Sequence, residues 1–169
     1  MKKSTLNRII IAAVVSMLPS IAVSDTSALF GKSLVCSTSI SGYTSKMTAF
    51  VSRDRVFLYH GGDRSKLGTV YEFAGTHSGM SSANSYTSNA RLSGDQIQLS
   101  RTVTNRTCRI CDGKTIMQSD EIVISSTGQG WGATRNYRQW FEDGTQAAVP
   151  SGSESYTCAV AAGRVGVGR

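Results

Sequence analysis

The sequence predicts an all-β fold, and three observations support that prediction. Apolar and polar residues alternate with a period of two through most of the chain, and turn-forming clusters of Gly, Asp, Asn and Ser separate the alternating runs. Beyond the N-terminus, no segment sustains the period of 3.6 that marks an amphipathic helix. Short strands at this regular spacing are typical of a β-sandwich or a β-barrel. A chain of 169 residues has room for one such domain.

The N-terminal segment has the three parts of a secretory signal peptide. Basic residues at positions 2, 3 and 8 precede an apolar run over 9–18, and Ala22 and Ser24 are the small residues that a signal peptidase recognises. The apolar stretch contains Pro19 and is shorter than the roughly 20 residues of a membrane span, so we predict no membrane anchor. We therefore expect residues 1–24 to be cleaved, 25–162 to form the exported β-domain and 163–169 to be a loose C-terminal tail. The mature protein is then periplasmic or secreted.

Removal of the signal peptide changes what the charge of the chain implies. The full chain carries 18 Lys+Arg against 11 Asp+Glu, a formal charge of +7, but three of the basic residues lie in the signal. The remaining 145 of the 169 residues keep an excess of +4, spread without a run of Lys or Arg. A surface for nucleic acid or for lipid head groups needs a more clustered charge. We therefore expect no nucleic-acid partner.

The alternating runs place the strands in order along the mature chain. Leu34 and Cys36 share one face of the first strand, and Met47, Ala49 and Val51 share one face of the second. Turn signals at 53–54, 93–95, 128–130 and 142–144 separate the later runs. Further strands are predicted over 55–60, 68–73, 86–92, 96–103, 116–126, 131–141 and 153–162.

Two segments carry mixed signals. Tyr137, Trp140 and Phe141 fall at helical spacing, but the run 131–141 also alternates as a strand, and we favour the strand. The Ser-, Gly- and Asn-rich stretch from Thr76 to Asn89 predicts a long mobile connection that leads into the strand over 86–92.

The four cysteines indicate disulfides, because an even number of Cys in an exported chain usually pairs. Cys108 and Cys111 are close enough to close a small ring at a hairpin tip, which leaves Cys36 to pair with Cys158. That second bridge would join the first strand of the mature chain to the last. The Cys108–Cys111 spacing lacks the helix of a thioredoxin site, the His of a haem attachment and the second close pair of a zinc site. We predict a structural turn disulfide, or a regulatory one if it is easily reduced.

A chain whose first and last strands are joined is expected to close its sheet. Closure removes the exposed strand edges that invite aggregation. We therefore predict a small antiparallel barrel of about eight strands, with a β-sandwich as the second choice. A barrel of this size either fills its interior with side chains or holds one small ligand.

The sequence offers no catalytic constellation. Its 2 His, His60 and His77, stand in no metal-ligating spacing, and no G-x-S-x-G nucleophile motif is present. The neighbouring carboxylates Asp120 and Glu121 point to opposite faces of a strand and cannot act as a pair. We predict no catalytic residues, no metal site and no cofactor. A hydrolase would require one of the His to meet a Ser or a carboxylate in a cleft.

Two surfaces carry the residue types that dominate protein recognition. One is the basic hairpin tip over 105–111, with Arg106, Arg109 and Ile110 as contact residues. The other is the segment with Arg135, Arg138 and Trp140, since exposed Arg and Trp are frequent at binding hot spots.

These features predict a non-enzymatic exported β-domain that binds a partner protein in the cell envelope or outside the cell. An inhibitor or an accessory subunit of an envelope complex would fit this description. The alternative is a lipocalin-like carrier that holds a small apolar ligand in the barrel.

Overall fold

Most strands of the structure follow the alternating runs of the sequence. The computed structural model describes residues 25–40, 42–61, 68–80, 84–105, 113–147 and 151–165. A short 3-10 helix, η1 (Thr26–Leu29), precedes the strands. The strands are β1 (Lys32–Ile40), β2 (Tyr43–Val51), β3 (Arg55–His60), β4 (Thr69–Glu72), β5 (His77–Met80), β6 (Asn84–Ser93), β7 (Gln96–Asn105), β8 (Ile116–Ser126), β9 (Trp131–Phe141) and β10 (Gly152–Ala162).

The strands form one sheet that closes into a barrel. The order is β4-β3-β2-β1-β10-β9-β8-β7-β6-β5, and β4 returns to pair with β6. This closing pair is parallel and joins Glu72 to Asn89, whereas the other neighbouring strands are antiparallel. Nine strands make the wall, and β5 lies beside β6 as an extra edge strand. The predicted barrel is thus confirmed, with one parallel seam in place of a fully antiparallel wall.

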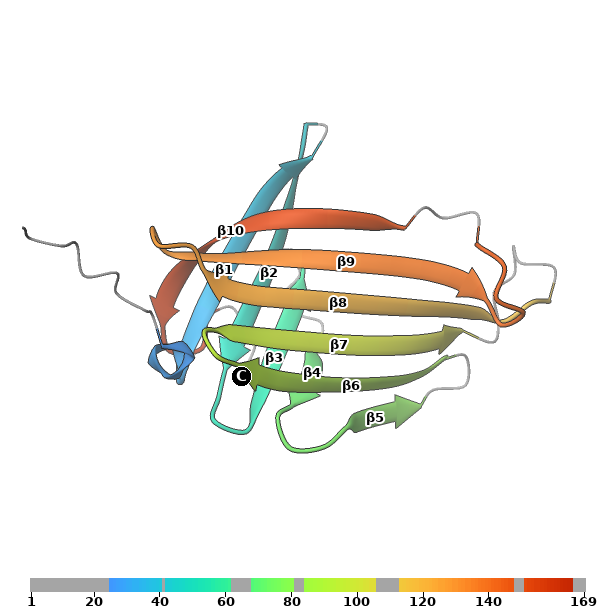
Figure 1. Ribbon diagram of the computed structural model, residues 1–169, viewed down its shortest axis with the longest axis horizontal. Helices are drawn as coiled ribbons and strands as arrows, with labels where there is room; N and C mark the ends of the chain where they lie inside the picture. Colours follow the sequence, from blue (N-terminus) through green and yellow to red (C-terminus); the bar gives the residue numbers. More distant parts are fainter. Residues whose placement is uncertain are drawn as a thin grey trace, which may run out of the picture.

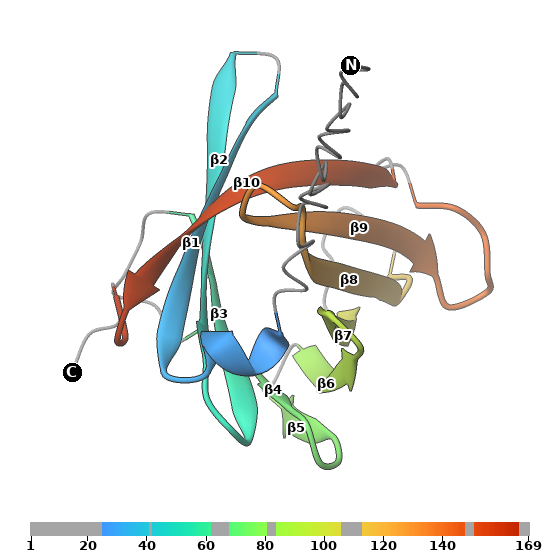
Figure 2. The same ribbon diagram turned by 60° about the vertical axis from the view of Figure 1, so that its left-hand side comes forward.

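The barrel is uneven because its two groups of strands differ in length and direction. Figure 1 shows β6 to β9 running side by side across the view, while β1 to β3 cross them steeply at one end. Figure 2 shows β10 passing from one group to the other, beside β1 at one end and beside β9 at the other. The long strands β6 to β10 therefore extend past the part of the barrel that β1 to β4 complete.

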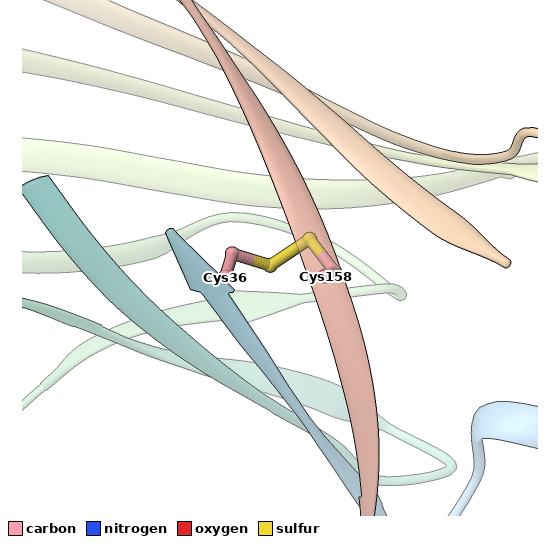
Figure 3. The surroundings of a disulfide bond; sticks show 2 residues. All are labelled: Cys36 and Cys158. Carbon is pink, nitrogen blue, oxygen red and sulfur yellow. A yellow bond between two sulfur atoms is a disulfide. The ribbon is translucent and has the colours of Figure 1, made fainter. Parts of the chain in front are cut away.

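The predicted disulfide between the first and the last strand is present. Cys36 and Cys158 are direct register partners across β1 and β10, with Cα atoms 4.0 Å apart, and their sulfurs are bonded (Figure 3). Both side chains are almost fully buried in the core. The other predicted pair, Cys108 and Cys111, lies outside the described residues.

The predicted long connection from Thr76 to Asn89 is wrong for most of its length. β5 and the first half of β6 occupy this stretch and pair with each other, with His77 opposite Ser88 and Met80 opposite Ser85. The composition misled because most of the Ser, Thr and Asn residues here are exposed or only partly buried, and the buried Ser88 forms a hydrogen bond with a backbone carbonyl. Backbone pairing orders such a segment without an alternating apolar pattern.

The run 131–141 forms β9, as favoured over a helix. Its residues pair with β8 along its whole length, from Ser126–Trp131 to Ile116–Phe141. Alternation then places Trp131, Ala133 and Arg135 on the inner face and Arg138 and Trp140 on the outer face.

The hydrophobic core occupies the end of the barrel where β1 to β4 and β6 to β10 overlap. We call this region the apolar half. Leu29 of η1 packs into it, so the helix covers that end of the barrel (blue in Figure 1). The members exposed by 1% or less are Leu29, Leu34, Cys36, Met47, Ala49, Val51, Val56, Leu58, Tyr71, Ile97, Leu99, Ile122 and Ile124.

The start of the predicted loose tail is attached to the outer face of the barrel. Ser33 on β1 donates a hydrogen bond to the carbonyl of Gly163 and accepts one from the amide of Val165. The guanidinium of Arg164 lies 4.4 Å from the ring centre of Phe57 and donates to the hydroxyl of Tyr59. In the part of the chain that the structure describes, no helix has the length and hydrophobicity of a membrane span.

Candidate functional site

The inward residues of the long strands change from apolar to polar along the barrel. On β7 the next inward residue after the buried Ile97 and Leu99 is Arg101. On the antiparallel strand β8, the inward residue that precedes the buried Ile122 and Ile124 is Asp120. We call the region beyond this change the polar half of the lumen. Its polar inward side chains are Tyr86, Ser88, Arg101, Gln118, Asp120, Arg135, Tyr137, Gln139 and Glu154, and Val103 of β7 faces the same region.

An ion pair between Arg135 and Asp120 lies at the centre of the polar half. The Nε and Nη2 atoms of Arg135 donate to Oδ1 of Asp120 at 2.9 and 2.6 Å. The side chain of Asp120 is 3% exposed and that of Arg135 is 21% exposed. Nη1 of Arg135 also lies 3.6 Å from Oε2 of Glu154, its register partner on β10. Arg135 therefore bridges two carboxylates from two neighbouring strands.

Further hydrogen bonds extend this ion pair in both directions across the lumen. Gln139 donates to Gln118 at 3.3 Å, and Gln118 donates to Oδ2 of Asp120 at 3.1 Å. On the other side the hydroxyl of Tyr156 donates to Glu154. The side chain of Ser45 lies 3.2 Å from the Tyr156 oxygen and must be the donor there, because Tyr156 gives its own proton to Glu154.

Burial and these charges shift the pKa values of the groups that face the polar half. Burial alone would lower the pKa of Arg135, but Asp120 and Glu154 outweigh it and the pKa is raised. Burial raises the pKa of Tyr71, and burial with the bond to Glu154 raises that of Tyr156. These groups keep their ordinary charge states at neutral pH and hold the network in one arrangement.

His60 faces the same region from the end of β3. His60 is partly exposed to solvent, but many protein atoms surround its ring. The resulting desolvation is the largest cause that lowers the pKa of the imidazole, and the positive charge of Arg135 is the second. The charges of Asp120 and Glu154 oppose this shift without reversing it. The imidazole is therefore neutral at physiological pH.

Arg101 stands apart from the network although it lies next to it. Its guanidinium carbon lies 5.3 Å from the ring centre of Tyr86, a cation–π contact. Its register partner on β8 is Asp120, whose oxygens already receive Arg135 and Gln118. Among the described residues, its buried Nε atom finds no hydrogen-bond acceptor.

A second histidine meets a carboxylate near the parallel seam. Nδ1 of His77 lies 3.5 Å from Glu72, and His77 stands opposite Ser88 in the register of β5 and β6. The hydroxyl of Ser88, however, is buried and donates to the backbone carbonyl of Val70 at 2.5 Å. Its proton is therefore directed away from the imidazole, and a serine nucleophile would need it directed toward the imidazole.

The structure separates the predicted contact residues of β9. Arg135 points into the lumen, whereas Arg138 and Trp140 lie on the outer face, where the Arg138 guanidinium carbon is 5.3 Å from the Trp140 ring centre. Arg106, Arg109 and Ile110 lie outside the described residues. Within the described ranges, no cluster of three or more His, Cys, Asp or Glu side chains is arranged to hold a metal ion.

The sequence analysis did not predict the ion-pair network in the lumen or the role of Arg101. A signal was nevertheless present. Arg101, Asp120 and Arg135 each continue an inward apolar series, which makes them charged residues at positions where alternation predicts core. The inward residues change from apolar to charged on four neighbouring strands, β7 to β10, and the charged residues are Arg101, Asp120, Arg135 and Glu154. Register pairing holds these four residues at nearly the same level along the barrel.

Comparison of the chain with known protein families, with curated proteins and with solved structures finds no match. The class of molecule that the geometry defines is a disulfide-linked β-barrel with a packed apolar half and a charged, hydrogen-bonded polar half.

Proposed function

We propose that the mature chain is an exported, non-enzymatic domain that binds a partner protein through the outer face of β9. The supporting observation is the cation–π contact between Arg138 and Trp140 on that face. Arg138 is exposed, and in the described part of the chain no carboxylate is bound to it. An Arg held against a Trp ring loses less side-chain freedom on binding and offers its donors to a partner.

The surroundings of this pair suit a protein surface. Met117 is the register partner of Trp140 on β8, and Thr104 of β7 donates a hydrogen bond to its sulfur. Met, Trp and Arg beside Thr and Ser hydroxyls give the mixed apolar and polar composition of protein interfaces. The end of β7 and the start of β8 lie at the same end of the sheet as Trp140, and residues 106–111 of the predicted hairpin tip lie outside the described residues. Export is supported by the signal-like N-terminus and by the Cys36–Cys158 disulfide.

The experiment compares three baits in capture from an envelope extract followed by cross-linking at β9. The baits are the mature protein, the double variant Arg138→Ala/Trp140→Ala, and Arg91→Ala as the matched control. Arg91 is an exposed Arg at the other end of the outer sheet face, on β6. We expect one protein to be retained by the wild type and by Arg91→Ala and to be lost by the double variant. An identical set of captured proteins from all three baits would contradict the proposal.

The carrier alternative has less support from the geometry. The apolar half is filled by side chains that are 0–1% exposed, and many of the inward residues beyond it are charged or amide-bearing. A ligand without a polar group would therefore meet charged and amide side chains in the part of the lumen that side chains do not fill. Native mass spectrometry of the purified protein tests this alternative, because a co-purifying hydrophobe would reinstate it.

A further inference from the structure

Arg101 carries hydrogen-bonding capacity that the protein does not use. Its Nε atom is buried and, as far as the described chain extends, has no acceptor. A buried donor without an acceptor lowers stability, so native proteins keep few of them. A donor that is left unpaired in the free protein gains a full hydrogen bond when an outside acceptor arrives.

The neighbours of Arg101 in the sheet are engaged elsewhere. On β8, both oxygens of Asp120 face other donors, Oδ1 facing Arg135 and Oδ2 facing Gln118. On β6, the register partner Ser88 donates its proton to Val70. The charge of Asp120 still acts on Arg101 through space, which weakens the attraction for an anion without filling the guanidinium's hydrogen-bonding positions.

Arg101 lines a cavity. The cavity has a volume of about 340 Å³ and is lined by Gly79, Met80, Asn84, Tyr86, Arg101 and Val103. This volume falls within the range of small-ligand pockets, which begins at roughly 300 Å³. The lining thus combines one cationic residue with the apolar or aromatic residues Met80, Tyr86 and Val103. The guanidinium carbon of Arg101 also lies 5.3 Å from the ring centre of Tyr86, a cation–π contact.

We propose that this cavity binds a carboxylate attached to a small apolar body. The planar guanidinium pairs with the two oxygens of a carboxylate in a fixed geometry, and the apolar body packs against Val103 and Tyr86. The carboxylate can belong to the C-terminus of a peptide or to a free organic acid, since both present the same chemistry. The site faces the lumen, so it stands or falls independently of the contact proposed on the outer face of β9.

The test uses matched acids and amides as probes of the mature protein. The probes are 4-phenylbutyrate, its amide, and a short peptide ending in Phe with either a free or an amidated C-terminus. Calorimetry measures affinity, and the arginine Nε–H resonances of the ¹⁵N-labelled protein report on Arg101 itself. We expect at least one free acid to bind and to shift the Arg101 resonance. We expect its amide to bind about tenfold or more weakly.

Substitutions separate a specific site from a general attraction. Arg101→Gln removes the fork and is expected to lower the affinity for the acid by about tenfold or more, whereas Arg91→Gln at an exposed position of β6 should leave it unchanged. Arg101→Lys keeps the charge but lacks the planar fork, so intermediate binding is expected. Since the resonance shift is measured on the unchanged chain, the proposal remains testable if a variant fails to fold.

Each outcome has a defined meaning. Binding of the peptide acid alone assigns the site to a peptide C-terminus, and binding of 4-phenylbutyrate alone assigns it to a free acid. The proposal is overturned if acids and amides bind equally, if Arg101→Gln binds like the wild type, or if no probe at millimolar concentration shifts the Arg101 resonance.

Discussion

The apolar half and the polar half of the barrel are built by the same strands, yet different interactions hold them. In the apolar half, β7 and β8 place Leu99 opposite Ile122, and both are 1% exposed. At the next inward position, two residues further along β7, Arg101 stands opposite Asp120. The first pair gains from removal of apolar surface from water, whereas the second must recover the cost of desolvating charge through hydrogen bonds.

Continuous backbone pairing lets the same strands have an apolar interior at one end and a charged interior at the other. Pairing between β7 and β8 runs unbroken from Gln96–Ser125 to Asn105–Ile116. Stability is therefore expected to concentrate in the apolar half. Binding of a small ligand inside the barrel is expected to concentrate where inward polar groups meet solvent. Removal of single groups from each half tests this division.

The largest effect is expected from the disulfide, which lies in the apolar half. Cys36 and Cys158 are separated by 122 positions, and a cross-link over a loop of this length contributes about 4–5 kcal/mol in the chain-entropy model. The double variant Cys36→Ala/Cys158→Ala should lose about this much free energy of unfolding in urea titrations. A loss below about 1 kcal/mol would show that the denatured chain gains little freedom when the bridge is removed.

A cavity in the apolar half comes next. Leu99→Ala removes a side chain that is 1% exposed, and such truncations cost about 2–5 kcal/mol. We expect about 3 kcal/mol from chemical unfolding. The matched control is Val103→Ala, an inward and partly exposed residue of the same strand in the polar half, which should cost less than half as much.

Breaking the ion pair of the polar half should cost somewhat less. Asp120→Asn leaves Arg135 without its main partner, and because Arg135 is 21% exposed we expect a loss of about 2 kcal/mol rather than the 3–5 of a fully buried pair. Replacing both partners by Asp120→Leu/Arg135→Met should cost less than the single change, since the only charge of the network that remains is Glu154, which keeps its hydrogen bond from Tyr156. A double variant that is less stable than Asp120→Asn would show that the pair itself stabilises the polar half.

The smallest effect is a pH dependence from His60. Its pKa is lowered below the usual value of 6.5, so between the two values the unfolded chain binds more protons than the folded one. The contribution of neutral His60 to the free energy of unfolding is therefore fully present above the pKa of the unfolded chain. It declines as the pH falls through that value toward the lower pKa of the folded protein. The imidazole keeps an exposed edge, so the decline is small. His60→Gln should flatten the difference between unfolding measured at about pH 7.5 and at about pH 5.

An NMR titration of the His60 ring checks the cause directly. A midpoint below 6.5 is expected in the folded protein. A midpoint above that value would mean that Asp120 and Glu154 outweigh burial and the charge of Arg135.

The sequence predicted the barrel because alternation and turn chemistry are local signals. The ranges predicted at 96–103, 116–126 and 131–141 match β7, β8 and β9 within two residues. The Cys36–Cys158 bridge followed from counting cysteines and from matching faces. The parallel seam between β4 and β6 could not be predicted in this way, because it rests on the single pairing of Glu72 with Asn89, which no pattern in either strand specifies.

The candidate site was harder to predict because it depends on register between strands. Arg135 resembles a surface Arg when read beside Trp140, and its burial follows from facing Glu154 and reaching Asp120 on two different strands. Arg101 on β7 lacks a carboxylate acceptor because Asp120 on β8 already accepts hydrogen bonds from Arg135 on β9. Its role therefore depends on residues of three different strands. Such relations become visible only after the sheet has been assembled.

The bridge between β1 and β10 also dictates when the barrel can be completed during biosynthesis. A chain that is synthesised from its N-terminus presents Cys36 early, and its partner follows 122 positions later. Until then β1 can pair with β2 but keeps its other edge unpaired, open to other chains. Oxidation is therefore a late step, and a delay in it prolongs the interval in which the growing sheet is most prone to aggregate.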